Sequence, residues 1–310
     1  MKRFLIAFLT IFISLALAQV IKPVDKPFQV NPAEYKSFTA PRWSPDGKKI
    51  MVSGANYTGI YLITFPEGKV EMISDEPSAG WGARWSHNGK WIAARVAKYE
   101  NNRRLNQVVV YDTESKTRQA LSSWESLLPG TPFWTTNDDM LYLSSTDKMR
   151  LYPLSKSSQQ PKENFAYVKN DRLFLYGSAD KQEKAADLGT ARILAITPSP
   201  DNKLLAVEKF DGTLTITQLD GSQPVEIGRG FQPTWSPDSR FICYTYALDD
   251  GHRYTYADLF IATADGKSRF QLTTTDLDLE MNPSWSPDGQ WIAYELMNKG
   301  SIMVQALEMK

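Results

Sequence analysis

Four aspartates stand in the same local setting, a proline-led turn just before an apolar strand. They are Asp46, Asp201, Asp238 and Asp288. Recurring carboxylates could ligate a metal ion or act in acid–base catalysis. Each one follows a proline at a turn position, however, where an aspartate side chain accepts hydrogen bonds from nearby backbone N–H groups. The pattern therefore favours four structural turns over a chemical site.

Other residues that carry chemistry are sparse. Cys243 is the only cysteine and lies in an apolar strand, which indicates a buried thiol and rules out an internal disulfide. The two histidines, His87 in a turn and His252 in a polar loop, have no metal-ligand partner at a recognisable spacing. We therefore predict no catalytic residue, no metal ligand and no cofactor; a channel-bound cation such as calcium stays open as an alternative.

The turn aspartates belong to a repeat. An aromatic anchor, Ser-Pro-Asp-Gly and an alternating strand follow one another at residues 285–295, and the copies nearest to this one start at Trp43 and Trp235. Weaker copies start at Trp85, Trp134 and Pro198, so that the anchors are 42, 49, 64, 37 and 50 residues apart. A repeat of this length that encodes short strands is typical of a β-propeller.

Each repeat predicts one blade of four antiparallel strands. In the first repeat, residues 59–63 and 69–73 form an outer hairpin around Pro66-Glu67-Gly68. The last repeat ends after its third strand, at residues 301–307, whereas residues 27–30 form a strand without a hairpin partner. Pairing these two segments would remove an exposed edge, so we predict that the N-terminal strand closes the last blade.

The interval from Trp134 to Pro198 is too long for one plain blade and short for two. Residues 172–176 and 184–188 resemble the outer hairpin of the other blades. Residues 149–168 then form an inserted hairpin or irregular loop, or alternatively a short extra blade. The prediction is an all-β, six-bladed β-propeller, with seven blades as the alternative.

The N-terminus has the pattern of a secretory signal peptide. Lys2 and Arg3 precede the apolar run 4–17, and Ala16-Leu17-Ala18 fits a cleavage site before Gln19. Residues 1–18 are thus predicted to be the signal peptide and residues 19–310 a single propeller domain. The mature protein is expected in the periplasm, or alternatively secreted, and not as an integral membrane protein.

Charge gives no reason to expect a nucleic-acid partner. The 35 basic residues balance 35 acidic ones, for a formal net charge of zero, and proteins that bind nucleic acid through its phosphates carry a basic surface.

Repeated Trp-Ser-Pro-Asp-Gly hairpins after a signal peptide resemble the TolB-type propellers, the WD-like Pro-Asp repeat family of bacterial envelopes. The best matches are residues 41–52, 233–244 and 283–294, and the repeats cover nearly all of the mature chain. The resemblance implies an exported propeller that acts mainly by binding other proteins. TolB also carries an α/β domain ahead of its propeller, and the sequence before Pro41 is too short for one, so the resemblance is to the propeller part.

Residues near the mouths of a propeller channel usually carry its function. Trp81, between two glycines, and Phe231 and Glu280 stand just before anchors and are candidates for binding. The loop before residue 257 adds Arg253, Tyr254 and Tyr256. For each of these six, ordinary packing or solvent exposure is the competing interpretation.

The sequence thus favours a non-enzymatic, exported propeller that acts as a protein-binding scaffold in the cell envelope. Its partner would be an envelope or secreted protein, and the chain would be a monomer or part of a hetero-complex. The alternative is a binder of a small ligand, glycan or cation in the central channel, with Glu280 in its lining. An enzyme is the least favoured class.

Overall fold

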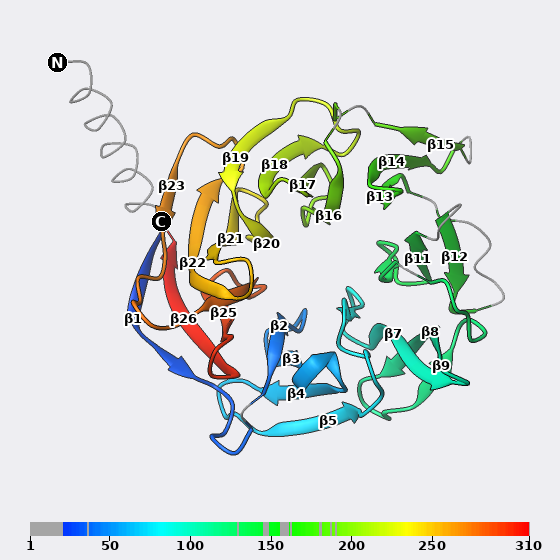
Figure 1. Ribbon diagram of the computed structural model, residues 1–310, viewed down its shortest axis with the longest axis horizontal. Helices are drawn as coiled ribbons and strands as arrows, with labels where there is room; N and C mark the ends of the chain where they lie inside the picture. The colour runs from blue at the N-terminus through cyan, green and yellow to red at the C-terminus, as the bar shows by residue number, and fades with distance from the viewer. Residues whose placement is uncertain are drawn as a thin grey trace.

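The computed structural model describes most of the chain after the predicted signal peptide, which lies outside it. The described residues are 21–35, 37–128, 130–144, 149–155, 161, 163–179, 182–186, 188–189 and 191–309. Seven antiparallel sheets stand in chain order around a central opening (Figure 1). The prediction of an all-β propeller is confirmed.

We number the sheets as blades I to VII, and five of them have four strands. Blade I consists of β2 (Thr39–Trp43), β3 (Lys49–Ser53), β4 (Ile60–Thr64) and β5 (Val70–Ser74). Blade II consists of β6 (Arg84–Trp85), β7 (Trp91–Glu100), β8 (Arg103–Asp112) and β9 (Arg118–Ala120). Blade V consists of β16 (Ile193–Pro198), β17 (Leu204–Lys209), β18 (Thr213–Gln218) and β19 (Val225–Arg229). Blade VI consists of β20 (Phe231–Trp235), β21 (Phe241–Asp249), β22 (Tyr254–Thr263) and β23 (Arg269–Gln271).

Blade VII contains both ends of the described chain. It consists of β24 (Glu280–Trp285), β25 (Trp291–Leu296), β26 (Ser301–Met309) and β1 (Ile21–Gln29), which is its outermost strand. β1 pairs antiparallel with β26, with Phe28 opposite Val304. The prediction that an N-terminal strand closes the last blade is confirmed, because β26 would otherwise present an unpaired edge.

The prediction of six blades was wrong, and the error lies between Trp134 and Pro198. This interval forms two three-stranded blades. Blade III consists of β10 (Phe133–Trp134), β11 (Met140–Ser144) and β12 (Met149–Pro153), and blade IV of β13 (Phe165–Lys169), β14 (Arg172–Gly177) and β15 (Gln182–Ala185). Residues 149–168 are therefore not an insertion, because they supply the third strand of blade III and most of the first strand of blade IV.

Blade IV lacks the Trp-Ser-Pro-Asp-Gly turn for a local reason. Its first two strands are joined by Asn170 and Asp171, which both have positive φ, 51° and 61°. A two-residue hairpin loop of this kind matches strand twist and needs no longer turn. The blade thus has no anchor tryptophan from which it could be counted.

The strand order gives the ring two distinct faces. The turns from first to second strand, which hold the repeated aspartates, lie on one face, which we call the turn face. The hairpins from second to third strand and the connections into the next blade lie on the other, which we call the hairpin face. Among the described residues, the one short helix is a 3-10 turn at Ala55–Tyr57, in the hairpin between β3 and β4.

The core consists of apolar clusters between adjacent blades. Trp43 and Ile50 of blade I, for example, pack with Ala293 and Val304 of blade VII. Cys243, in β21, is fully buried, and burial raises the pKa of its thiol. It belongs to a packed cluster, as a small apolar residue would.

Anchor tryptophans also fasten consecutive blades through hydrogen bonds. The indole N–H of Trp85 donates to the carbonyl oxygen of Arg42 at 3.2 Å, and that of Trp134 donates to the carbonyl oxygen of Arg84 at 3.1 Å. In both pairs the acceptor directly precedes the anchor of the previous blade. These bonds fix the backbone beside the central opening, where the side chains of the two arginines lie.

Candidate functional site

The turn face is built from self-capped turns. The Ser286 hydroxyl donates to Asp288 Oδ1 at 2.5 Å, and the same oxygen accepts the backbone N–H of Gln290 at 3.0 Å. Asp46, Asp201 and Asp238 make the corresponding pairs of contacts in their own blades. Each of these carboxylates is thus occupied within its turn.

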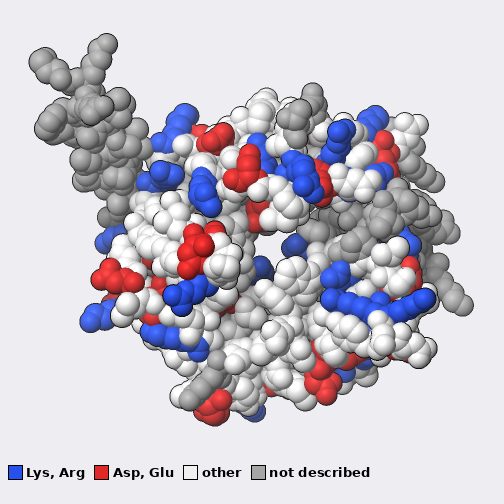
Figure 2. Space-filling model, in the orientation of Figure 1, with Lys and Arg blue, Asp and Glu red and all other residues white. Residues whose placement is uncertain are grey.

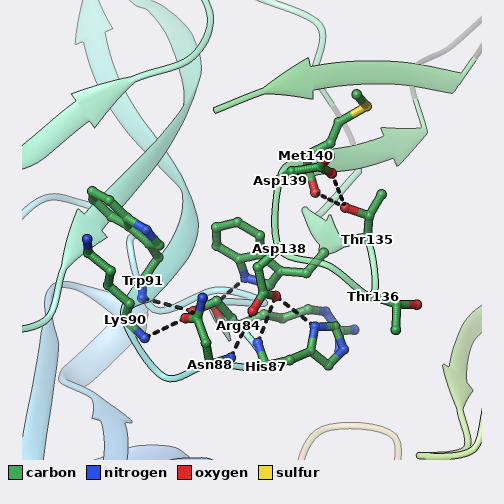
Figure 3. A network of polar contacts seen from close by, with 12 residues as sticks. Arg84, His87, Asn88, Lys90, Trp91, Thr135, Thr136, Asp138, Asp139 and Met140 are labelled. Carbon is green, nitrogen blue, oxygen red and sulfur yellow. Dashed lines mark hydrogen bonds and ion pairs between the residues drawn. The ribbon is translucent and has the colours of Figure 1, made fainter. Parts of the chain in front are cut away.

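His87 links two of these turns. Its Nδ1 lies 2.7 Å from Asp138 Oδ1, and Asp138 also accepts the backbone N–H groups of His87 and Asn88, both at 2.8 Å (Figure 3). The hydrogen bond to Asp138 raises the pKa of His87, whereas the bonds from His87 and Asn88 outweigh burial and lower the pKa of Asp138. The His87–Asp138 contact is therefore a joint between blades II and III.

On the hairpin face, bulges in the innermost strands turn backbone N–H groups toward the preceding blade. Ala40, Gln232 and Asn282 each lie three residues before an anchor and have positive φ between 52° and 55°. The ladder shifts register at each of these places. Such a bulge re-aims the backbone without breaking the sheet.

A side chain of a neighbouring blade accepts a hydrogen bond from each of these backbone N–H groups. Glu295 Oε2 accepts from Ala40 at 2.7 Å, Glu208 Oε2 accepts from Gln232 at 2.8 Å, and Gln232 Oε1 accepts from Asn282 at 3.0 Å. Glu208 and Glu295 are buried and stand ten residues after their anchors, a spacing that the sequence carries but that reasoning from single repeats missed. Burial raises the pKa of Glu208. These contacts tie blades V, VI, VII and I into one arc.

Trp81 lies on the hairpin face, as its position before an anchor indicated. Its side chain is 45% exposed and meets the Tyr57 ring edge-to-face, with centroids 4.7 Å apart. Both residues belong to connections and not to strands. The pair presents an aromatic surface to solvent on a rigid support.

Phe231 and Tyr254 stack on one another, with ring centroids 6.0 Å apart, and both are half-buried against a small cluster at Met281. Arg253 is exposed at the tip of the β21–β22 hairpin, 3.7 Å from the Asp250 carboxylate. Of these three residues, only Arg253 is exposed over most of its side chain.

Tyr256 and Glu280 belong to a polar cluster inside blade VI and its junction with blade VII. Tyr256 donates to Asp258, which also accepts from Gln271 at 2.6 Å and from Thr273 at 3.1 Å. Glu280 is 1% exposed; its Oε1 accepts from Thr275 at 2.6 Å, and its Oε2 has no hydrogen-bond partner among the described residues.

Burial, together with the neighbouring Asp258 carboxylate, raises the pKa of Glu280 to about 7. The expectation that Glu280 lines the channel is wrong: the residue is enclosed in the blade junction and is not among those that form the channel cavity.

The central opening contains a cavity of about 530 Å³ whose walls come from all seven blades. It is visible in Figure 2 as a hole through the ring, with basic side chains in its wall. Its charged or titratable lining residues within the described part of the chain are Arg42, Arg84, His87, Tyr142 and Glu163. Glu163 accepts a hydrogen bond from the backbone N–H of Thr136 at 2.6 Å, which compensates part of its negative charge. The wall is therefore basic, which does not suit a cation.

Exposed apolar side chains are unevenly distributed between the faces. Of the twelve large exposed ones among the described residues, nine lie on the hairpin face, three on outer strands and none on the turn face. The nine are Tyr35, Trp81, Tyr99, Leu127, Leu194, Phe210, Leu248, Leu277 and Met297. We call this set the apolar face. Scattered exposed apolar residues are ordinary, but their concentration on one face is not.

The described residues contain neither a metal-binding cluster nor a membrane-spanning helix. They hold no group of three or more His, Cys, Asp or Glu residues placed to bind a metal ion. They also hold no helix with the length and apolar character needed to cross a bilayer.

No protein-family model and no curated protein matches the chain. Its fold nevertheless matches solved structures. A chain of the mitotic checkpoint complex aligns with a TM-score of 0.62 and 15% identity over 92% of this chain and 91% of that one. Oligogalacturonate lyase from Vibrio parahaemolyticus aligns with a TM-score of 0.62 and 11% identity over 92% and 97%.

TolB from Acinetobacter baumannii aligns with a TM-score of 0.55 and 18% identity over 81% of this chain and 57% of that one. This chain thus spans little more than half the length of that TolB. Identities this low show a shared fold alone. The resemblance indicated by the Trp-Ser-Pro-Asp-Gly repeats is confirmed at that level: the chain is a propeller similar in fold to TolB.

Proposed function

We propose that this protein is an exported, non-catalytic propeller that binds an envelope protein through its apolar face. The single observation that carries the proposal is the concentration of nine large exposed apolar side chains on the hairpin face. Removal of such a surface from water stabilises a complex by roughly 25 cal/mol per Å² of apolar area. The partner is thus expected to present an apolar surface of its own.

The support beneath this face is rigid. The side-chain contacts of Glu208, Gln232 and Glu295 hold the innermost strands of blades V to I at that mouth. A preorganised surface loses little conformational entropy when it binds. Trp81, fixed against Tyr57 at 4.7 Å, is the aromatic anchor that we place nearest the centre of the interface.

Export rests on the N-terminal sequence and belongs to the same proposal. Lys2, Arg3 and the apolar run 4–17 would direct the chain out of the cytoplasm, with cleavage before Gln19. Periplasmic TolB-like propellers provide the analogy for location, which is an argument from fold alone. The mass of the protein purified from the envelope fraction checks it, since cleavage removes residues 1–18.

The binding test is cross-linking of the tagged mature protein in its native envelope, with variants on and off the apolar face. Tyr99 and Leu277 are 72% and 85% exposed, so Tyr99→Ala and Leu277→Ala remove contact area without disturbing the core. Met72→Ala, 51% exposed on outer strand β5, is the matched control. We expect a reproducible partner with the wild type and the control, and its loss with the double variant. Capture that survives the double variant would place the interface elsewhere.

A further inference from the structure

The channel wall contains two basic side chains at equivalent positions in neighbouring blades. Arg42 and Arg84 each directly precede an anchor tryptophan, in blades I and II. In blades VI and VII the same position holds Thr234 and Ser284, whose hydroxyls accept the backbone N–H of the next blade's anchor at 3.3 and 3.1 Å. At this position a small hydroxyl residue is sufficient to accept the backbone N–H of the next anchor. That role does not explain why blades I and II have arginines there.

Neither guanidinium has a carboxylate hydrogen-bond partner among the described residues. Arg42 donates to the carbonyl oxygen of the adjacent Pro41 at 2.7 Å. Arg84 Nε is inaccessible to solvent and makes no hydrogen bond in that part of the chain, and the guanidinium lies 3.8 Å from the centroid of the Phe133 ring. A desolvated cation without an anion is costly unless something supplies the negative charge.

The electrostatics of the pair agree with this geometry. Burial, and then the positive charge of Arg42, lower the pKa of Arg84 to about 10. Burial also lowers the pKa of Arg42, although the negative charges of Glu295 and Glu208 act to raise it. Both groups stay charged at neutral pH, so two positive charges face one cavity, and Glu163 is the carboxylate among its described lining residues.

We infer that Arg42 and Arg84 form a binding site for the oxyanion of a small molecule inside the channel. An arginine fork matches the two oxygens of a carboxylate or of a phosphate, and both sources share this chemistry. The cavity of about 530 Å³ lies within the range of small-molecule sites. Phe133 and Trp85 line the same wall, so the ligand carries an apolar or aromatic body next to its charge. This site is separate from the apolar face and does not depend on it.

The test is calorimetric titration of the mature protein, residues 19–310, with three probes. These are inorganic phosphate, phenylacetate, and phenylacetamide as the neutral isostere. We expect one or both oxyanions to bind and phenylacetamide not to bind. Tighter binding of phosphate or of phenylacetate identifies the source of the oxyanion. Absence of binding by both oxyanions at millimolar concentrations, or equal binding of phenylacetamide, would overturn the inference.

Variants locate the site. Arg84→Gln is expected to weaken oxyanion binding about 10- to 100-fold, because it removes a charge-assisted bidentate contact, and Arg42→Gln to weaken it similarly. Arg240→Gln, at an exposed arginine paired with Asp238, is the matched control and should bind as the wild type does. Unchanged affinity in Arg84→Gln would refute the assignment.

The stability of the protein without ligand gives a second, independent test of the inference. Without ligand, Arg84→Met should melt at a temperature equal to or higher than that of the wild type, because a partly buried charge without a carboxylate partner is replaced by an apolar chain of similar length. Marked destabilisation by Arg84→Met would show that the guanidinium is satisfied by the protein itself and would contradict an unfilled oxyanion site.

Discussion

His87 Nδ1 and Asp138 Oδ1 meet at 2.7 Å across the boundary between blades II and III. In the turn of blade II, His87 takes the place of the usual proline. The buried Asp138, in the turn of blade III, points toward the preceding blade and contacts it. It makes the stability of this boundary depend on pH in two ranges, above pH 6.5 through His87 and below pH 3.8 through Asp138.

The pH dependence has a defined window. The pKa of His87 is raised from 6.5, so its stabilising contribution is complete below pH 6.5 and is lost as pH rises through the raised value. The pKa of Asp138 is lowered from 3.8, so its contribution is complete above pH 3.8 and is lost as pH falls through the lowered value. We expect His87→Ala to reduce the melting temperature more at pH 5 than at pH 9, with His252→Ala as the control. The His87 side chain is 59% exposed, so the effect should stay below about 1 kcal/mol. An equal effect at both pH values would contradict the pairing.

Glu280 should make the free energy of unfolding decrease as pH rises from weakly acidic to alkaline values. Its pKa is raised from 4.5 to about 7, so the stabilising effect of the neutral carboxyl is complete below pH 4.5 and is lost as pH rises through 7. Glu280→Gln keeps a neutral side chain at every pH. Relative to the wild type, it should gain about 3 kcal/mol in free energy of unfolding between pH 4.5 and pH 8.5. Urea unfolding at these two pH values measures the gain, and Glu226→Gln, on exposed strand β19, should show none.

Glu295 is expected to be essential to the junction between blades VII and I. Its two oxygens accept from Ala40, Thr39 and Asn282. Because Glu295→Ala leaves these donors without an acceptor in a site where Glu295 is 4% exposed, we expect a loss of about 2 to 4 kcal/mol in unfolding free energy. Glu295→Gln, which keeps one acceptor oxygen, should lose less. A loss below about 0.5 kcal/mol in Glu295→Ala, as for a surface site, would show that the junction holds without it.

Removing β1 should open the ring. A mature chain that begins at Val30 lacks the partner of β26 and the fully buried side chain of Ile21. We expect a lower melting temperature and association through the exposed β26 edge, measured by calorimetry and by light scattering after gel filtration. Phe28→Ala is the control, because Phe28 is 40% exposed and contacts Trp291 at a centroid distance of 6.2 Å. That variant should remain monomeric and lose about 1 kcal/mol.

The sequence was informative wherever a repeat had both a tryptophan anchor and a turn aspartate. It predicted the propeller, the blade of four strands and the closing strand, because each of these follows from local turn chemistry and alternation. It undercounted the blades because Asn170 and Asp171 replace the long turn in blade IV. A hairpin loop of two residues leaves no periodic landmark in the sequence.

The channel site was missed because it depends on closure of the ring. Arg42 and Arg84 are 42 residues apart and become neighbours only when blades I and II pack side by side. The signal was nonetheless present: both residues directly precede an anchor. The position of Tyr256 and Glu280 in the sequence predicts a place near a mouth, but it does not reveal that Glu280 is enclosed next to Asp258.

Ile21 and Met309 are register partners in β1 and β26, so the two ends of the described chain meet at the rim of one blade (Figure 1). The folded ring therefore does not require the chain to begin and end in blade VII. A circular permutant that joins these ends and opens in a turn of another blade would keep every blade contact. A tag fused at either end would stand at the rim of blade VII and leave both mouths of the channel accessible.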